Sequence, residues 1–209
     1  MNGSLGIGEK RQGNLSQKRK NGLCPRVIGS NPLNLTFIKL SSSMEISKTA
    51  PIAKGPQEGE NLSVVGDTYR ILITGKETGG AFAVIDMLIP PNGGPGPHSH
   101  ANFQESFYVI DGEIEVKSEV STYTATKGSF VSIPKGGIVH SFKNKTDQIA
   151  HLLCTVVPSG LEGFFMEIGK PVAIGSFLAP PPMDAEAIKK ILPIVEKYGQ
   201  KLFPPDYLG

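Results

Sequence analysis

The fold is most constrained by a series of short apolar segments that recur about every ten residues between residues 62 and 157. Turn-forming residues separate these segments, and the Asp111-Gly112 pair is a strong signal for a β-hairpin. Residues 113–119 alternate between apolar and charged side chains, which is typical of a strand with one buried face. This spacing favours a β-sandwich or β-barrel over βαβ units. We expect strands at residues 69–74, 81–89, 107–110, 113–119, 121–126, 129–133, 139–142 and 149–157.

The N-terminal part of the chain has a different composition. Residues 1–43 carry seven basic residues and one acidic residue, and they are rich in Gly, Ser and Asn. With one small apolar cluster, they cannot bury enough surface to offset the entropy lost on ordering. We therefore expect a disordered basic leader over residues 1–43, with Met44 as the natural start of the protein. Two alternatives stay open: a transit peptide, or a basic run that contacts nucleic acid or a membrane surface.

The rest of the chain is divided into a barrel domain over residues 44–175 and an extension over residues 176–209. From residue 44 onward, 14 basic residues face 18 acidic ones, and this balance argues against a nucleic-acid surface. No apolar run approaches the roughly 20 residues of a membrane span. Cys24 and Cys154 fit no CxxC spacing, so we expect reduced thiols and a cytoplasmic location.

Two helices are expected after the last strand. Residues 161–168 form one candidate helix, and residues 185–192 form a second one with Asp184 as its N-cap. Pro193 lacks a backbone N–H, so we expect it to break or kink the second helix. The second helix is expected to pack outside the barrel, as a short C-terminal helical extension.

Three of the four histidines surround one glutamate in a pattern that can hold a metal ion. His98 and His100 are two residues apart, so both side chains point to the same face of an extended strand. Glu105 follows shortly afterwards, and His140 opens a later strand. Three imidazoles and one carboxylate suit one divalent ion of Fe, Mn, Ni, Cu, Co or Zn better than Ca or Mg. The spacing alone also allows exposed loop histidines without a metal. The fourth histidine, His151, is expected to be structural.

Two segments carry a resemblance to a known family. PHSHANFQESFYVIDGEIEV (residues 97–116) resembles the first cupin motif, and GSFVSIPKGGIVHSFKN (residues 128–144) resembles the second. The second motif has one residue more than usual between its glycine and His140. A turn at Gly136-Gly137 or a bulge can absorb this residue; otherwise His140 points to the wrong face of its strand. The later PSGLEGFF and KYG segments are similar to the quercetin-dioxygenase-like branch of single-domain cupins.

The resemblance implies an all-β cupin jelly-roll β-barrel with the metal ligands pointing inward, and a homodimer. It also implies a mononuclear-metal oxidoreductase of the dioxygenase type that acts on a small organic substrate inside the barrel. Glu105 would then be both a metal ligand and a catalytic base. A non-catalytic binding protein and a metal-dependent isomerase or lyase are the alternatives. The candidate residues of the substrate pocket are Phe82, Met87, Gln104, Phe107 and Phe142. For the apolar ones, ordinary core packing is the competing interpretation, and Tyr108 is expected to face outward.

Overall fold

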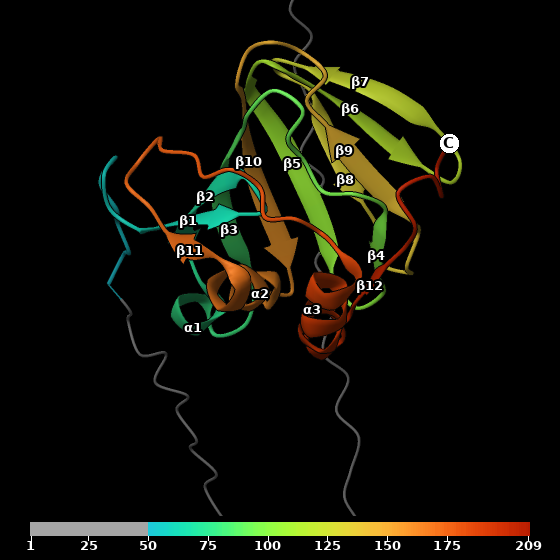
Figure 1. The fold of residues 1–209 in the computed structure, drawn as a ribbon. Helices are drawn as coiled ribbons and strands as arrows, with labels where there is room; N and C mark the ends of the chain where they lie inside the picture. Colours follow the sequence, from blue (N-terminus) through green and yellow to red (C-terminus); the bar gives the residue numbers. More distant parts are fainter. Residues whose placement is uncertain (1–49) are drawn as a thin grey trace, which may run out of the picture. The chain divides into compact units, whose positions relative to one another are not determined.

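The computed structural model describes residues 50–209, which form two antiparallel sheets (Figure 1). The predicted leader over residues 1–43 lies outside the described residues. The seven-stranded sheet contains, in spatial order, β11 (Lys170–Pro171), β1 (Glu60–Val64), β2 (Asp67–Ile73), β3 (Ala83–Ile89), β10 (Ala150–Val157), β5 (Gln104–Asp111) and β8 (Phe130–Ile133). The five-stranded sheet contains β12 (Gln200–Leu202), β4 (His98–His100), β9 (His140–Lys143), β6 (Glu113–Ser118) and β7 (Thr122–Thr126).

The inward faces of both sheets supply one hydrophobic core. In β3, every second side chain is buried, from Ala83 through Ile85 and Met87 to Ile89, because successive residues of a strand point to opposite faces. Ile114 from β6 and Phe142 from β9 belong to the same cluster. Burying one such large aliphatic or aromatic side chain contributes about 1.5–3 kcal/mol. The predicted all-β jelly-roll barrel is confirmed.

All eight expected strands are present, most with ends shifted by one to three residues. The structure also has strands that the apolar pattern did not indicate, namely β1, β11 and β12. The sequences of these strands are short or mostly polar. β11 pairs with β1 and β12 pairs with β4, both distant in sequence, whereas β1 also pairs with β2 across a tight turn. Where a turn was expected, residues Gly75–Thr78 form the short helix α1.

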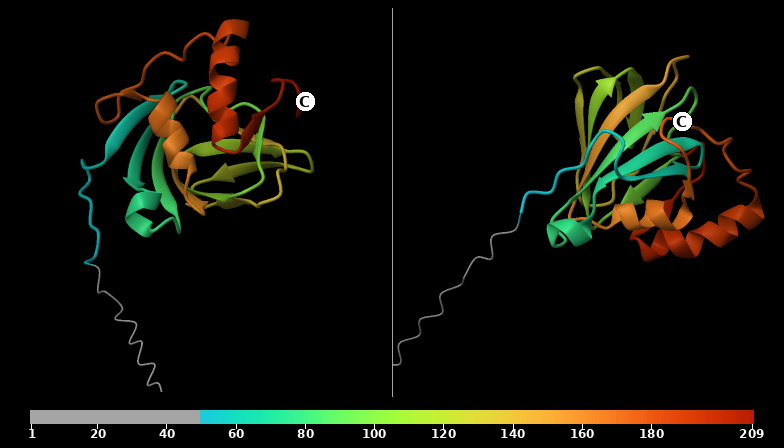
Figure 2. Two further views of the ribbon diagram at one scale, coloured as in Figure 1. Left: turned by 90° about the horizontal axis from the view of Figure 1, so that it is seen from below. Right: turned by 90° about the vertical axis from the view of Figure 1, so that its left-hand side faces the viewer.

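Three helices, α1, α2 (Leu161–Ile168) and α3 (Ala185–Lys197), lie at the same end of the barrel (Figures 1 and 2). The Asp184 side chain caps α3 by accepting a hydrogen bond of 2.8 Å from the Ala187 N–H, as predicted. Of the two predicted effects of Pro193, a break or a kink, the break is wrong, because α3 continues through Pro193 to Lys197. Val195 is buried in the core, and this packing opposes the roughly 3 kcal/mol that an internal proline costs. None of the helices among residues 50–209 is long and apolar enough to cross a membrane.

The loop before β4 is held in place by contacts with both sheets, and these contacts determine where β4 begins. Asn144, at the end of the second motif, is fully buried and donates hydrogen bonds to Ile89 O (2.9 Å) and Gln148 O (2.6 Å). Gly94 has φ of 111°, and a Cβ there would lie 2.3 Å from Phe142 O, so only glycine fits. The Gly94 N–H also donates to the Asp67 carboxyl at 3.1 Å.

Candidate metal centre

Four side chains meet inside the barrel: His98 and His100 from β4, Glu105 from β5 and His140 from β9. Each offers a nitrogen or oxygen atom, and these atoms all lie within 4.8 Å of one another. The Nε2 atoms of His100 and His140 lie 3.3 Å and 3.7 Å from Glu105 Oε2. All four residues are buried. Because β5 belongs to the other sheet, the group joins the two layers of the barrel.

The local strand geometry explains why the histidines converge. His98 and His100 share a face of β4, and His98 is paired directly with His140 on β9. The extra residue of the second motif is absorbed in the turn before β9, where Gly136 and Gly137 adopt φ of 122° and 83°. These left-handed conformations are readily accessible only to glycine. His140 therefore faces inward and is 1% exposed.

Backbone carbonyls orient all three imidazole rings. The Nδ1 atoms of His98, His100 and His140 lie 3.0, 3.1 and 3.0 Å from the carbonyl oxygens of Gly96, Phe103 and Ile138. A carbonyl only accepts, so each Nδ1 carries the proton and donates. When such a ring is neutral, its lone pair is on Nε2, and this is the tautomer that binds a metal ion through Nε2.

The charges of the group also suit a cation. Burial opposes ionisation of Glu105, but the contacts with His100 and His140 outweigh it and hold the pKa of the carboxyl well below its usual range. Burial, reinforced by the nearby His140, lowers the pKa of His98 to about 4, so this ring is neutral near pH 7. His140 Nε2 is buried without any hydrogen-bond partner. A bound cation would complete this site, and the donor set fits a first-row transition metal.

Sequence reasoning did not place Cys154 at this site. The Cys154 thiol on β10 donates to the second oxygen of Glu105, with a Sγ–Oε1 distance of 3.4 Å. Burial and the Glu105 charge raise the pKa of this thiol well above its usual value, so it stays protonated. Alternation along β10 could have indicated an inward side chain, but not its contact with Glu105.

The structure separates the five predicted pocket residues into two groups. Met87, Phe107 and Phe142 are buried in the core, and the rings of Phe107 and Phe142 meet edge to face with centroids 5.1 Å apart. Gln104 is exposed and donates to Ser132, because it precedes the inward Glu105 and so faces the opposite side of β5. Phe82 lies before β3 and is 38% exposed. Gln104 and Phe82 therefore do not line the interior of the barrel.

Tyr108 points outward, as predicted, and is largely exposed. His151 also lies outside the four-residue group: its Nε2 contacts the Asp86 carboxylate, which pairs with Arg70 at 2.7 Å. This contact agrees with the structural role predicted for His151.

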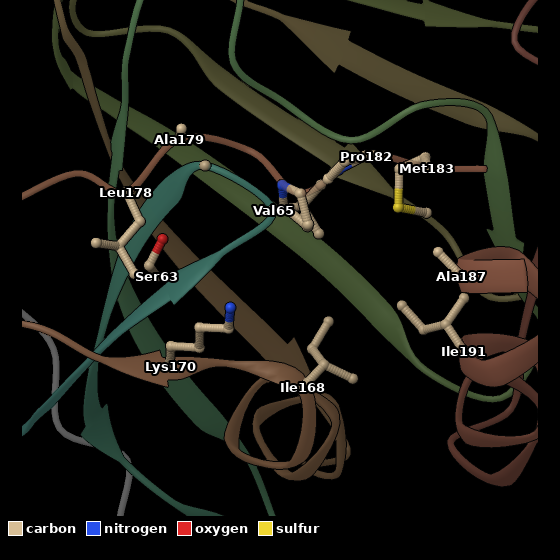
Figure 3. Close-up of a pocket in the computed structure, with 12 residues that line it drawn as sticks. Ser63, Val65, Ile168, Lys170, Leu178, Ala179, Pro182, Met183, Ala187 and Ile191 are labelled. Atoms are coloured by element: carbon tan, nitrogen blue, oxygen red, sulfur yellow. The ribbon is translucent and has the colours of Figure 1, made fainter.

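A separate pocket of about 170 Å³ lies between the β1–β2 turn, α2, the segment before α3 and α3 itself (Figure 3). Its lining is mostly apolar, with side chains such as Leu178, Met183 and Ile191, and it contains none of the four clustered residues. It is therefore distinct from the candidate metal centre.

Comparison with known proteins identifies the domain that contains the four clustered residues. Residues 85–156 match the family model of the cupin domain, and this span contains the four clustered residues and both motifs. The chain therefore contains a cupin domain at residues 85–156. Among curated proteins, the chain resembles quercetin 2,3-dioxygenase of Bacillus subtilis (strain 168), with 25% identity over 170 residues. The alignment covers 80% of this chain and 49% of the relative, so the chain spans about half of that enzyme's length.

Solved structures similar to this chain come from several organisms. The cupin domain of Schizosaccharomyces pombe Cnp3 matches with a TM-score of 0.42 and 23% identity, covering 53% of this chain and 77% of that one. Ectoine synthase from P. lautus gives a TM-score of 0.45 and 22% identity, covering 63% and 100%. A predicted oxalate decarboxylase from Thermotoga maritima gives 0.47 and 16%, covering 52% and 99%.

Proposed function

We propose that this cupin binds one divalent transition metal ion through His98, His100, Glu105 and His140, and that it is an oxidoreductase of the dioxygenase type. The ion would be Fe, Mn, Ni, Cu, Co or Zn. One observation carries the metal proposal: three imidazole nitrogens and one carboxylate oxygen lie within 4.8 Å of one another, and all four residues are buried. The resemblance to quercetin 2,3-dioxygenase supports the reaction type.

The residues of the chain have separate tasks in this proposal. When bound, the ion supplies a Lewis acid and a template for the substrate. Glu105 Oε2 lies 3.3 Å and 3.7 Å from the Nε2 atoms of His100 and His140, so its carboxylate is placed to accept the proton that an enol or phenol loses on binding. The Cys154 thiol holds the other carboxylate oxygen and so fixes the direction of Glu105. The carbonyl partners of the three imidazoles keep each ring in one tautomer.

The lining of the barrel favours an uncharged aromatic or enolisable substrate. Phe103, Phe107 and Phe142 are buried near the motif strands, and the buried polar residues of the described chain include neither Lys nor Arg. Arg70 instead pairs with Asp86 on another face. A sugar phosphate or keto acid would need such a cation inside the barrel, and for this reason an isomerase or lyase is the weaker alternative.

Oxygen uptake by metal-loaded protein tests the function. The protein is loaded separately with each of the six metals and mixed with a panel of flavonols and 1,3-diketones. We expect oxygen consumption with at least one combination, its loss in His98→Ala, and its retention in His151→Ala, the matched control outside the site. Glu105→Gln should keep part of the metal and lose most of the turnover. Tight ligand binding without turnover would instead favour the non-catalytic binding protein, and conversion without oxygen would favour an isomerase or lyase.

Three features stay predictions. The homodimer implied by the family resemblance can be tested by light scattering coupled to size-exclusion chromatography. The cytoplasmic location can be tested by cell fractionation. The division at residues 43/44 and 175/176 can be tested by limited proteolysis.

A further inference from the structure

We propose that Gln200 is a ligand-binding residue of the metal centre, whose side-chain amide donates a hydrogen bond to an anionic group of the ligand that completes the coordination of the ion. This inference rests on the metal-binding part of the proposed function. It assigns a role to the C-terminal strand β12, which no cupin motif of the chain includes.

The strand register places Gln200 beside the histidines. In the antiparallel pair of β12 and β4, Gln200 lies directly opposite His100, and Leu202 lies opposite His98. Directly opposed residues share a face of the sheet, with Cβ atoms about 4.5–5.5 Å apart. Gln200 therefore lies on the face that carries the histidine ligands. Lys201, between the two, is exposed on the other face.

The Gln200 amide has no partner of its own. Among residues 50–209, two buried side-chain nitrogen or oxygen atoms lack a hydrogen bond: His140 Nε2 and Gln200 Nε2. Gln200 is only 6% exposed. Buried polar groups in native proteins nearly always have partners, so an orphaned donor needs an explanation. His140 Nε2 is an expected metal ligand. Gln200 Nε2 lies on the same face of the sheet as His100 and is free to donate a hydrogen bond to a ligand of the ion.

The fold holds Gln200 firmly in this place. The chain leaves α3 through Gly199, which has φ of 70°, and Val195 anchors the end of that helix in the core. On the other side of β12, the Phe203 N–H donates to Pro97 O at 3.0 Å, immediately before His98. Figure 1 shows β12 following α3 and running beside β4. The amide is thus preorganised relative to the histidine strand rather than attached to a free end.

An amide N–H is a neutral donor, and this decides what it can recognise. It stabilises the negative oxygen of an enolate, phenolate or carboxylate, or a simple inorganic anion, without neutralising the ion's own charge. We therefore expect Gln200 to raise the affinity for anionic ligands and to leave the affinity for the metal itself nearly unchanged.

Azide binding to cobalt-loaded protein tests the proposal. Azide is titrated into Co(II)-loaded wild type, Gln200→Met, Gln200→Glu and the matched control Lys201→Met, and binding is followed by the visible absorption of cobalt. Metal content is measured by mass spectrometry for each variant. Both Gln200 variants should weaken azide binding about tenfold or more with the metal retained, and Lys201→Met should stay within about twofold. The melting temperature of metal-free Gln200→Met should be equal to or above wild type, because an unpartnered buried donor is removed.

The outcomes separate this inference from the proposed function. Weakened azide binding without any oxygen consumption would support Gln200 and contradict the dioxygenase. Oxygen consumption with azide affinity unchanged in both Gln200 variants would overturn the role of Gln200 alone. A failure of cobalt to bind to wild type would overturn both, and cobalt bound without azide binding would overturn the role of Gln200. A crystal structure with azide whose nitrogen atoms all lie beyond hydrogen-bond distance of Gln200 Nε2 would also overturn it.

Discussion

His98 and His140 occupy directly opposed positions on β4 and β9, and their imidazole centroids lie 4.3 Å apart. The two rings therefore converge through strand pairing alone, although they are 42 residues apart in the chain. A metal ion bound by both rings would account for two imidazoles that lie so close together and are so buried. The following predictions test this arrangement and the groups that support it.

Removing either ring of this pair should remove the metal. We expect His98→Ala and His140→Ala to lose most bound metal, measured by mass spectrometry after dialysis against a metal mixture. A bound ion stabilises the folded state by about 2.7 kcal/mol at a concentration 100 times Kd, so wild type should melt higher with metal and the variants should not. His151→Ala is the control with an intact site. Equal metal content in all four proteins would refute the assignment.

The thiol contact to Glu105 predicts an effect on metal affinity. Cys154→Ala removes the donor to Oε1, whereas Cys154→Ser keeps a hydroxyl of similar size. Groups that orient metal ligands typically change affinity by about 10- to 100-fold when removed. We expect Cys154→Ala to weaken metal binding in this range and Cys154→Ser to weaken it less, as measured by competition with a chelator of known affinity. Identical affinities in the three proteins would show that the thiol only fills space.

The turn before β9 predicts a linked loss of stability and metal. Gly137 has φ of 83°, and alanine in such a conformation costs about 1–2 kcal/mol. If the turn relaxes to avoid this strain, His140 is displaced from its inward position. Gly137→Ala should therefore lower the melting temperature and weaken metal binding together, whereas Gly209→Ala, also at positive φ but at the end of the described chain, should change neither. Full metal affinity in Gly137→Ala would show that the extra residue of the motif does not control His140.

The buried carboxyl of Asp67 predicts a pH dependence of stability. Burial raises the pKa of Asp67 from 3.8 to about 7, against hydrogen bonds from Tyr69 and Gly94 that lower it. Between these two values the folded state binds more protons than the unfolded state, so stability falls as the pH rises from about 4 to 7. Relative to Asp67→Asn, wild type should lose about 3 kcal/mol of unfolding free energy over this range. Denaturant titrations at several pH values measure the difference, and parallel profiles would contradict it.

The sequence was informative where a local pattern determines the structure. Alternation in β6, the HxH spacing of β4 and the capping residue Asp184 each act within a few residues, and each appears in the structure as expected. The two glycines of the second motif also explain how its extra residue is accommodated, since both adopt positive φ.

The sequence was less informative where distant segments meet. Nothing near Cys154 indicates that its thiol meets Glu105, which is 49 positions earlier. The pairing of Gln200 with His100 likewise depends on the path of α3 across the end of the barrel. The prediction that Gln104 lines the pocket is wrong, because Glu105 is the first residue of β5 whose side chain points inward, and Gln104 faces the opposite side. At Pro193, tertiary packing outweighed local propensity.

β12 covers the outer side of β4, which would otherwise be the last strand of its sheet. The strand that carries two of the candidate ligands therefore depends on three residues close to the C-terminal end of the described chain. Any affinity tag or shortened version that disturbs residues 200–202 would leave the N–H and C=O groups of β4 open to water or to a second molecule. For biochemists who prepare this protein, a fusion that disturbs these three residues would therefore also disturb the candidate metal centre, so assays of metal content should include untagged protein.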